Sequence, residues 1–205
     1  MAIILNLKLY QSIIVYITSM HIRKFRYDNN ERRKILSPEA ILKLTELTSG
    51  MIFLDIGSNN GYFSLPAAQI IGPTGKVNAI DIDSVALQDL KDTALEHGIQ
   101  NIRTFNIAVE DLKPHQFDSD IIFFGTVLHD LKDPLKALIN ARDNLVKDGI
   151  IYNLDWQKHD SSIGPPFEIR FSKEYAAELT AKAGLKIVDI QDIDENFYLE
   201  RIVRE

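Results

Sequence analysis

Residues 54–68 read LDIGSNNGYFSLPAA, and this stretch decides the fold of the chain. It begins inside the apolar run MIFLDI at 51–56, which is typical of a short buried strand. A glycine-bearing loop follows, and an apolar stretch with helical spacing then runs over 62–71 and ends at Gly72-Pro73. A strand, a glycine-bearing loop and a helix in this order are typical of a nucleotide-binding βα unit.

Strands and helices alternate along the rest of the chain. Further strand-like runs occupy 76–82, 101–107, 119–127 and 149–155. Helices are predicted at 38–47, at 84–97, from 134 to about 149, and at 172–183. The runs 185–193 and 196–204 are separated by only a short turn, so they must pair as an antiparallel hairpin. The pattern predicts an α/β fold, with a doubly wound, mostly parallel seven-stranded sheet, a terminal antiparallel hairpin, and helices on both faces.

Length and composition favour one globular domain. The chain has 205 residues, of which 45% are apolar and 25% are charged. We assign 1–36 to an N-terminal extension, with a lid as one interpretation, and 37–205 to a single domain. The net charge of −6 disfavours a nucleic-acid partner. The chain has no cysteine, which excludes disulfides and cysteine nucleophiles and fits a cytoplasmic location.

The first twenty residues, MAIILNLKLYQSIIVYITSM, are mostly apolar but are interrupted by polar side chains. A spanning helix needs about 20 predominantly apolar residues, so we predict no transmembrane span. Three interpretations stay open. The segment is a helix that packs on the domain or a partner, a segment with weak membrane contact at 1–19, or an upstream extension with Met20 as the start. The oligomeric state also stays open.

The loop after 51–56 does not match the dinucleotide fingerprint G-x-G-x-x-G. Counted from Gly57, the second and third glycines would have to stand where the chain has Asn59 and Tyr62. Asp55 adds a charge argument, because a carboxylate at this place repels the pyrophosphate that a dinucleotide brings to the helix N-terminus. It suits a ligand with a positive charge and no phosphate, such as S-adenosyl-L-methionine.

The sequence DIGSNNG, from Asp55 to Gly61, resembles the acidic-x-G-x-G-x-G motif of class I S-adenosylmethionine-dependent methyltransferases. The LDW and GPPFEIR segments further resemble a group of small prokaryotic, type 11-like members. Asn59 replaces the middle glycine, and asparagine tolerates positive φ better than most residues. The resemblance covers about 35–205 and implies a Rossmann-like methyltransferase. It implies cofactor contacts from Asp55, Gly57, Ser58, Asn59 and Gly61.

The end of the second strand adds two candidate cofactor residues. Asp81 stands about twenty residues beyond Gly61, where the family places the acid that accepts both ribose hydroxyls. Ile82 follows and would stack on the adenine. Asp83 is interpreted as the cap of the next helix, which is also the alternative role for Asp81.

The segment after the third strand, 108–112, resembles the adenine-binding segment of the family less closely. Ala108 stands where the family usually has an aspartate that accepts a hydrogen bond from the adenine. Val109 is left to present its backbone N–H to the ring. Glu110 either substitutes for the acid or lies solvated on the surface.

The end of the fourth strand is the expected meeting point of cofactor and acceptor. Gly125 and Thr126 would line the methionine part of the cofactor. His129 is the candidate catalytic base, because histidine has an unperturbed pKa of about 6.5; the alternative is a histidine packed in the following helix. A base is needed only where the acceptor must lose a proton, whereas in-line positioning is needed in every case.

The fifth strand delivers Asn153, Asp155 and Trp156 to the acceptor side, and a long loop at 155–172 follows. In one interpretation this loop covers the acceptor pocket with Trp156, Phe167 and Arg170 facing inward; in the other it is a surface excursion. The histidines show no metal-ligand spacing, and we predict no metal site.

The favoured hypothesis is an S-adenosylmethionine-dependent methyltransferase that acts on a small-molecule acceptor. Three alternatives stay open: a quinone-type C-methyltransferase, a protein or RNA methyltransferase that docks through the basic segment 21–34, and a non-catalytic S-adenosylmethionine-binding protein. The missing acid at Ala108 motivates the last of these. An NAD-binding protein is the remaining rival.

Overall fold

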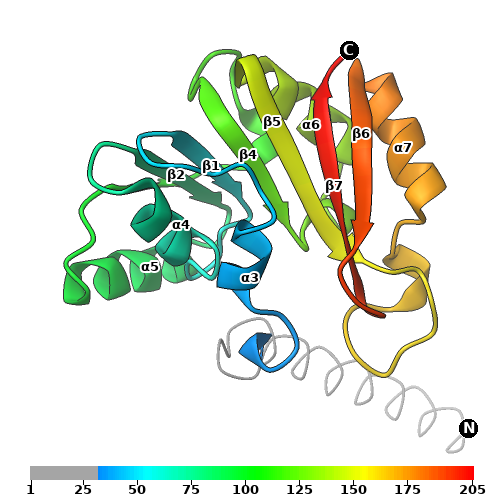
Figure 1. Ribbon diagram of the computed structural model, residues 1–205, viewed down its shortest axis with the longest axis horizontal. Coiled ribbons are helices and arrows are strands. Elements are labelled where there is room, and N and C mark those ends of the chain that lie inside the picture. The colour runs from blue at the N-terminus through cyan, green and yellow to red at the C-terminus, as the bar shows by residue number, and fades with distance from the viewer. Residues whose placement is uncertain (1–31) are drawn as a thin grey trace, which may run out of the picture. The chain divides into compact units, whose positions relative to one another are not determined.

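The computed structural model describes residues 32–205 (Figure 1). Compact packing divides the chain into two units, Met1–Ser37 and Pro38–Glu205, and the second unit carries the fold. The expectations for 1–31, including membrane contact, a start at Met20 and the larger part of the lid, lie outside the described residues. The assignment of an extension and a single domain therefore stays a prediction.

The second unit is built on a seven-stranded sheet with the order β3-β2-β1-β4-β5-β7-β6 (Figure 1). Neighbouring strands among β1 to β5 pair in parallel, and β7 runs antiparallel to both of its neighbours, β5 and β6. The strands are β1 Ile52–Ile56, β2 Lys76–Asp81, β3 Ile102–Asn106, β4 Ser119–Gly125, β5 Leu145–Trp156, β6 Leu185–Asp192 and β7 Phe197–Arg204. The predicted sheet with its terminal antiparallel hairpin is confirmed.

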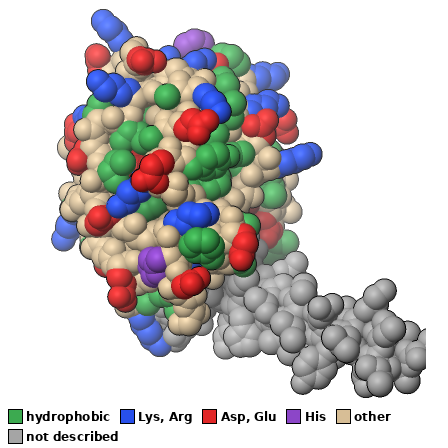
Figure 2. Space-filling view, turned by 90° about the vertical axis from the view of Figure 1, so that its right-hand side faces the viewer, with side chains coloured by type: hydrophobic (Ala, Val, Ile, Leu, Met, Phe, Trp, Pro, Cys, Tyr) green, Lys and Arg blue, Asp and Glu red, His purple; other side chains and the backbone are tan. Residues whose placement is uncertain are grey.

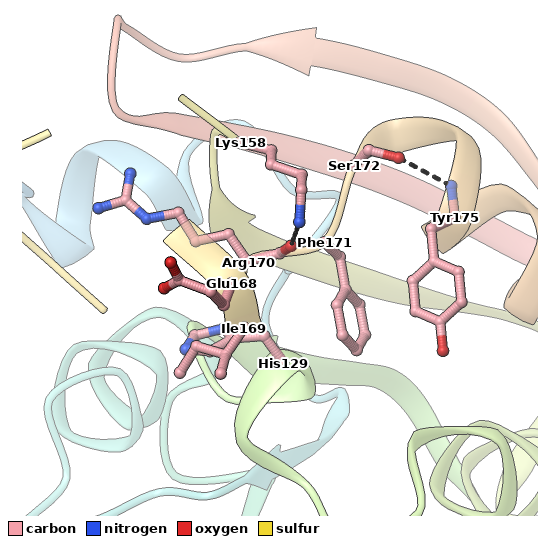
Figure 3. Close-up of a pocket in the computed structure, with 8 residues that line it drawn as sticks. All are labelled: His129, Lys158, Glu168, Ile169, Arg170, Phe171, Ser172 and Tyr175. Atoms are coloured by element: carbon pink, nitrogen blue, oxygen red, sulfur yellow. Dashed lines mark hydrogen bonds between the residues drawn. The ribbon is translucent and has the colours of Figure 1, made fainter. Parts of the chain in front are cut away.

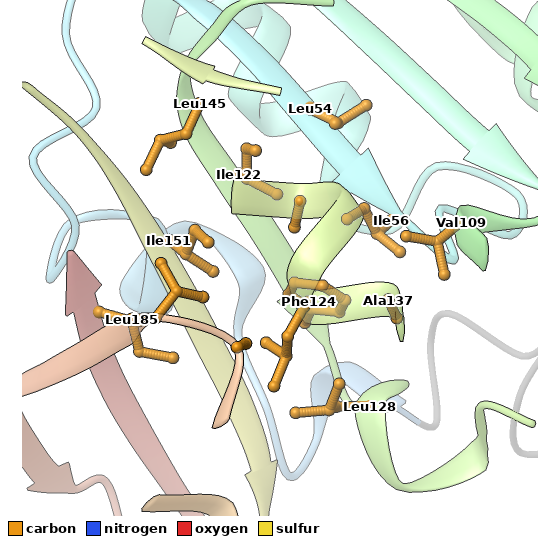
Figure 4. Close-up of a cluster of buried hydrophobic side chains, with 14 of the residues drawn as sticks. Leu54, Ile56, Val109, Ile122, Phe124, Leu128, Ala137, Leu145, Ile151 and Leu185 are labelled. Atoms are coloured by element: carbon orange, nitrogen blue, oxygen red, sulfur yellow. The ribbon is translucent and has the colours of Figure 1, made fainter. Parts of the chain in front are cut away.

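Helices cover both faces of this sheet. They are α3 Pro38–Leu42, α4 Ser64–Ile71, α5 Ser84–Glu96, α6 Pro134–Asp143 and α7 Lys173–Lys182. Alternate residues of each strand point to opposite faces. Leu54 of β1 therefore belongs to a buried cluster with side chains of α6 and α7 (Figure 4). Phe53 lies on the other face, where its ring stacks on Phe123, which in turn contacts Phe63 just before α4.

Two predicted helices are too long. The first ends at Leu42 instead of near Leu47, because the Thr45 hydroxyl donates to the Leu42 carbonyl and competes with a further helical turn. The helix α6 ends at Asp143 instead of near Gly149. Asn144 ends it, because its fully buried amide donates to the carbonyls of Lys113 and Asn140 and accepts from the Phe117 N–H.

The strand β5 is correspondingly longer than predicted. It begins at Leu145, which pairs with Ser119, and the register shifts before Ile121 pairs with Ile150. Among the described residues, no helix has the length and apolar character that crossing a membrane requires.

Candidate functional site

The strand order reverses between β2-β1 and β4-β5, and the carboxyl ends of these strands meet at one edge of the sheet. Ligands of open parallel sheets bind at such a reversal. The predicted site residues Asp55, Asp81, Gly125 and His129 all lie at or just beyond the carboxyl ends of strands along this edge.

Asp55 lies beneath the loop and not at its surface. Its side chain is 1% exposed, and its Oδ2 accepts a hydrogen bond of 2.5 Å from the hydroxyl of Ser64. Ser64 is the first residue of α4, so the carboxylate ties the end of β1 to the start of the helix. Its charge still lies below the loop and favours a positively charged ligand there.

The two glycines of the loop are required by close packing as well as by backbone conformation. Gly57 has φ +68°, and a Cβ on it would lie 2.5 Å from Cγ2 of Val127. Gly61 has φ +89°, and its Cβ would lie 2.2 Å from Cδ1 of Leu90. Asn59 has φ +49°, which is the left-handed region that asparagine tolerates. Ser58 is turned inward, with a hydroxyl that is buried and without a hydrogen-bond partner.

Asp81 is held in place by backbone donors from two sides. Its Oδ2 accepts from the N–H of Asn59 at 2.8 Å, and its Oδ1 accepts from the N–H of Asp83 at 2.8 Å. Each carboxylate oxygen can accept a second hydrogen bond, so the fixed carboxylate can still take a pair of hydroxyls. Asp83 caps α5 through bonds from the N–H groups of Val85 and Ala86, as predicted.

The predicted adenine residues differ in exposure. Ile82 is 76% exposed directly after Asp81, so its side chain is free to cover a ring. Val109 is buried and begins a short 3-10 helix, η1 Val109–Asp111. The N–H of the first residue of such a helix has no acceptor within the helix. Glu110 accepts a weak bond of 3.4 Å from the Asp133 N–H, which directs it toward the start of α6.

The chain turns sharply where β4 ends. A Cβ on Gly125 would lie 2.7 Å from the ring of Phe63. Thr126 has φ +58°, which is strained for a β-branched residue. Its N–H donates to the Leu154 carbonyl at 2.7 Å, which holds the strained turn against β5. Strain of this kind is stored where the surrounding structure demands it, often at functional sites.

The turn brings His129 onto the carboxyl end of β5. Nδ1 of His129 lies 2.6 Å from Oδ1 of Asp155, and both side chains are almost fully buried. The Trp156 N–H donates to the same Asp155 oxygen. Asp155 was not predicted as the partner of His129. The one signal in the sequence is an acid near the end of a mostly apolar strand run.

A cavity of about 390 Å³ opens beside His129. Its other walls come from the loop after β5 and the start of α7 (Figure 3). They are formed by Lys158, residues 168–172 and Tyr175. The rings of Phe171 and Tyr175 meet edge to face, with centroids 4.8 Å apart. The cavity is therefore lined by the aromatic rings of Phe171 and Tyr175 and by the imidazole of His129.

Arg170 organises the loop that forms this wall. Its guanidinium is buried and donates to the carbonyls of Gln157, His159, Ile163 and Pro165. It also lies over the ring of Trp156, which is buried against Phe197. The expectation that Trp156, Phe167 and Arg170 all face an acceptor is wrong in part. Trp156 and the Arg170 guanidinium hold the loop together, and Phe167 is 43% exposed.

The sequence interpretation missed Tyr198 and Glu200, which are buried beside Asn153 beneath His129. Asn153, Tyr198 and Glu200 are fully buried on the paired strands β5 and β7. Among residues 32–205, no group of three or more histidine, aspartate or glutamate side chains is arranged to hold a metal ion.

Comparison with curated proteins finds a methyltransferase. The chain is 29% identical over 114 residues to aklanonic acid methyltransferase DauC from Streptomyces sp. (strain C5). The match covers 54% of this chain and spans about half of the length of that relative (50%).

Solved structures share the fold. A SAM-dependent methyltransferase from Aquifex aeolicus superposes with a TM-score of 0.81 and 23% identity over 91% of this chain and 98% of that one. The 1,6-didemethyltoxoflavin-N1-methyltransferase from Burkholderia thailandensis, solved with bound 1,6-didemethyltoxoflavin and S-adenosylhomocysteine, superposes with a TM-score of 0.69 and 16% identity. That match covers 96% of this chain and 89% of the other.

A family model described as a methyltransferase domain matches residues 47–183. The matched region runs from before β1 to just past α7 and includes the glycine loop, Asp81 and the His129–Asp155 pair. Because the model covers more than half of the chain and the fold agrees with it, the chain belongs to the methyltransferase domain family.

Proposed function

We propose that the chain is an S-adenosylmethionine-dependent methyltransferase that methylates a small-molecule acceptor. The observation that carries the proposal is the loop of Asn59 and Gly61 joined to the fixed carboxylate of Asp81. When bound, this cofactor supplies a methyl group on a positively charged sulfur. The site fits it, because Asp81 has acceptor capacity for two hydroxyls and Asp55 places negative charge below the loop.

The residues of the cofactor site have distinct roles in this proposal. Asp81 binds the ribose, Ile82 covers one face of the adenine, and Val109 offers its N–H to the ring edge. Gly57 and Gly61 let the loop approach the ligand closely, and Asn59 orients the loop through its bond to Asp81. The turn at Gly125 and Thr126 borders the methionine part. The backbone of Ser58 belongs to the same loop, while its hydroxyl is turned inward.

His129 and Asp155 supply the base for an acceptor that must lose a proton. Nδ1–H of His129 donates to Asp155, and Nε2, which lies 3.5 Å from Oδ1 of Asp130, is the nitrogen that takes the proton. Asp155 acts as a positioning residue, because its bond selects the imidazole tautomer and fixes the ring. The Trp156 N–H donates to the same oxygen and helps to hold that carboxylate in place.

A small-molecule acceptor fits the size and walls of the cavity beside His129. Its volume of about 390 Å³ falls in the range of small-ligand sites. The named methyltransferases of similar sequence or fold act on aklanonic acid and on 1,6-didemethyltoxoflavin. On the face seen in Figure 2, acidic and basic side chains are interspersed, which does not favour docking of RNA. We place the enzyme in the cytoplasm, because a chain without cysteine suits a reducing compartment.

Ligand-induced stabilisation tests the cofactor assignment. The melting temperature is measured with S-adenosylmethionine, S-adenosylhomocysteine and NAD for the wild-type chain, for Asp81→Ala, and for Asp89→Ala as a matched variant of an exposed acid on α5. A ligand at 100 times its dissociation constant stabilises the fold by about 2.7 kcal/mol. We expect both adenosyl ligands to stabilise the wild type and Asp89→Ala, and to lose this effect in Asp81→Ala.

Two results would contradict the proposal. Stabilisation by NAD alone would reassign the loop to a dinucleotide. Equal stabilisation of wild type and Asp81→Ala by the adenosyl ligands would remove Asp81 from the site. A second assay, transfer of a labelled methyl group to extracted small molecules, separates an enzyme from a protein that only binds the cofactor.

A further inference from the structure

Four polar side chains form a row on one face of the sheet beneath His129. We call Asn153, Asp155, Tyr198 and Glu200 the buried polar row. Asn153 pairs with Glu200 across β5 and β7, and Asp155 pairs with Tyr198, so the two pairs are adjacent on the same face. Each of the four is at most 1% exposed. The next pair along the strands, Ile151 and Ile202, belongs to the apolar cluster under α6 and α7.

The row is incompletely hydrogen-bonded. Nδ2 of Asn153 donates to Oε2 of Glu200 at 2.8 Å, and Oδ1 of Asp155 is occupied by His129 and Trp156. Four buried oxygens in the same row have no protein partner: Asn153 Oδ1, Asp155 Oδ2, Tyr198 OH and Glu200 Oε1. Each buried polar atom without a hydrogen bond lowers the stability of the fold by about 1–3 kcal/mol. In proteins such atoms are typically bridged by buried water.

The charges around the row favour one ionised carboxyl rather than two. Burial, with a further contribution from Asp155 on β5, raises the pKa of Glu200 to about 7, while the Asn153 hydrogen bond and Lys173 on α7 lower it. Burial also raises the pKa of Tyr198, with contributions from Asp155, Glu200 and Glu174. Tyr198 is thus a neutral O–H donor, and Glu200 is protonated for a large part of the time near neutrality.

We propose that the buried polar row is a water-bridged proton-holding site in which Glu200 acts as a positioning residue for Asp155 and, through it, for His129. A neutral Glu200 offers an O–H donor to the unpaired oxygens of the row, whereas an ionised Glu200 only accepts. With the proton in place, the row has a single negative charge, on Asp155, which binds the Nδ1–H of His129. Without it, two buried carboxylates repel each other. The catalytic meaning of His129 rests on the proposed function, but the proton-holding site does not.

A carboxyl-carbon NMR titration of the full chain with isotope-labelled glutamate tests the site. The Glu200 signal is identified by its loss in Glu200→Gln. We expect a wild-type midpoint near pH 7. We expect Asp155→Asn to lower this midpoint, because a negative charge is removed, and Lys173→Gln to raise it. Glu178→Gln, an exposed acid on α7, is the matched control and leaves it unchanged.

The His129 Nδ1–H signal tests the positioning role. At about pH 5.5, where Glu200 is protonated, we expect wild type and Glu200→Gln to give the same signal. At about pH 8.5, where wild-type Glu200 is ionised, we expect the two signals to differ. A Glu200 midpoint in the ordinary acidic range, or one that Asp155→Asn does not lower, overturns the proton-holding site. Identical His129 signals at both pH values overturn the positioning role. No methyl donor is used, so failure of the cofactor assignment would be seen separately.

Discussion

Some residues of the site have a structural role as well as a proposed role in binding. The structural role can be measured without a substrate. Asp81 holds the loop through Asn59 and is also the proposed ribose acceptor. Asp55 anchors the first residue of α4 and also sets the charge below the loop. Variants of these residues change stability and binding together. Gly61 and Glu200 give the clearest predictions at this scale, because the effect of each substitution on stability is measured without a ligand.

We expect Gly61→Ala to destabilise the fold by about 2–5 kcal/mol, because strain at φ +89° adds to the overlap with Leu90. Gly98→Ala is the matched control. Gly98 has φ +68°, but nothing lies within 4 Å of its added Cβ, so only the conformational cost of about 1 kcal/mol applies. Urea unfolding of both variants measures the difference. An equal loss of stability in Gly61→Ala and Gly98→Ala would show that the Leu90 side chain moves aside.

We expect Glu200→Gln to become more stable than wild type as the pH rises. Folding raises the pKa of Glu200 from 4.5 to about 7, so the folded state favours the protonated form. The stability that this group contributes is complete below about pH 4.5 and is lost as the pH rises through about 7. The loss amounts to roughly 3 kcal/mol, and glutamine does not undergo it. Unfolding free energies at several pH values measure the effect, and parallel curves for the two proteins would exclude it.

At the scale of elements, the loop between β5 and α7 is a structural unit with Arg170 inside it. Its backbone carbonyls converge on one guanidinium, and Lys158 closes it by donating to the Arg170 carbonyl at 2.6 Å. Burial lowers the pKa of Arg170, while Asp155 and Asp160 act in the opposite direction. The loop therefore forms one wall of the cavity with a fixed shape.

We expect Arg170→Lys to destabilise the fold by about 2–4 kcal/mol, because an ammonium cannot reach four carbonyls in the planar geometry of a guanidinium. Hydrogen exchange should increase within 157–172 and stay unchanged in α5. Arg103→Lys, an exposed residue of β3, is the control and should change neither quantity. Unchanged hydrogen exchange within 157–172 would show that packing against Trp156 is enough to keep the loop folded.

At the scale of the whole molecule, the sheet separates two groups of site residues along one edge. Asp81 ends β2 and Val109 follows β3, whereas His129 follows β4 and Asp155 lies near the end of β5. The reversal of strand order between β1 and β4 lies between the two groups. If the proposed roles hold, we therefore expect substitutions in one group to leave the role of the other group intact.

We expect His129→Gln and Asp155→Asn to keep the full stabilisation by S-adenosylhomocysteine, about 2.7 kcal/mol at 100 times the dissociation constant. Methyl transfer to an acceptor that must lose a proton should fall by about 10²–10⁴-fold in His129→Gln. Asp81→Ala, in contrast, should lose the stabilisation. Loss of ligand binding in His129→Gln would place that residue in the cofactor site.

The sequence by itself determined the alternation of strands and helices, the terminal hairpin, the glycine loop and the cap at Asp83, because each depends on local periodicity or on turn chemistry within a few residues. The limits of α6 and β5 needed the tertiary structure, because distant partners of Asn144 and Ser119 set them. The tertiary structure was also needed to find the pairing of His129 with Asp155, the loop around Arg170 and the buried polar row. These contacts join residues on different strands and loops, and strand order and register, which no local pattern encodes, bring them together.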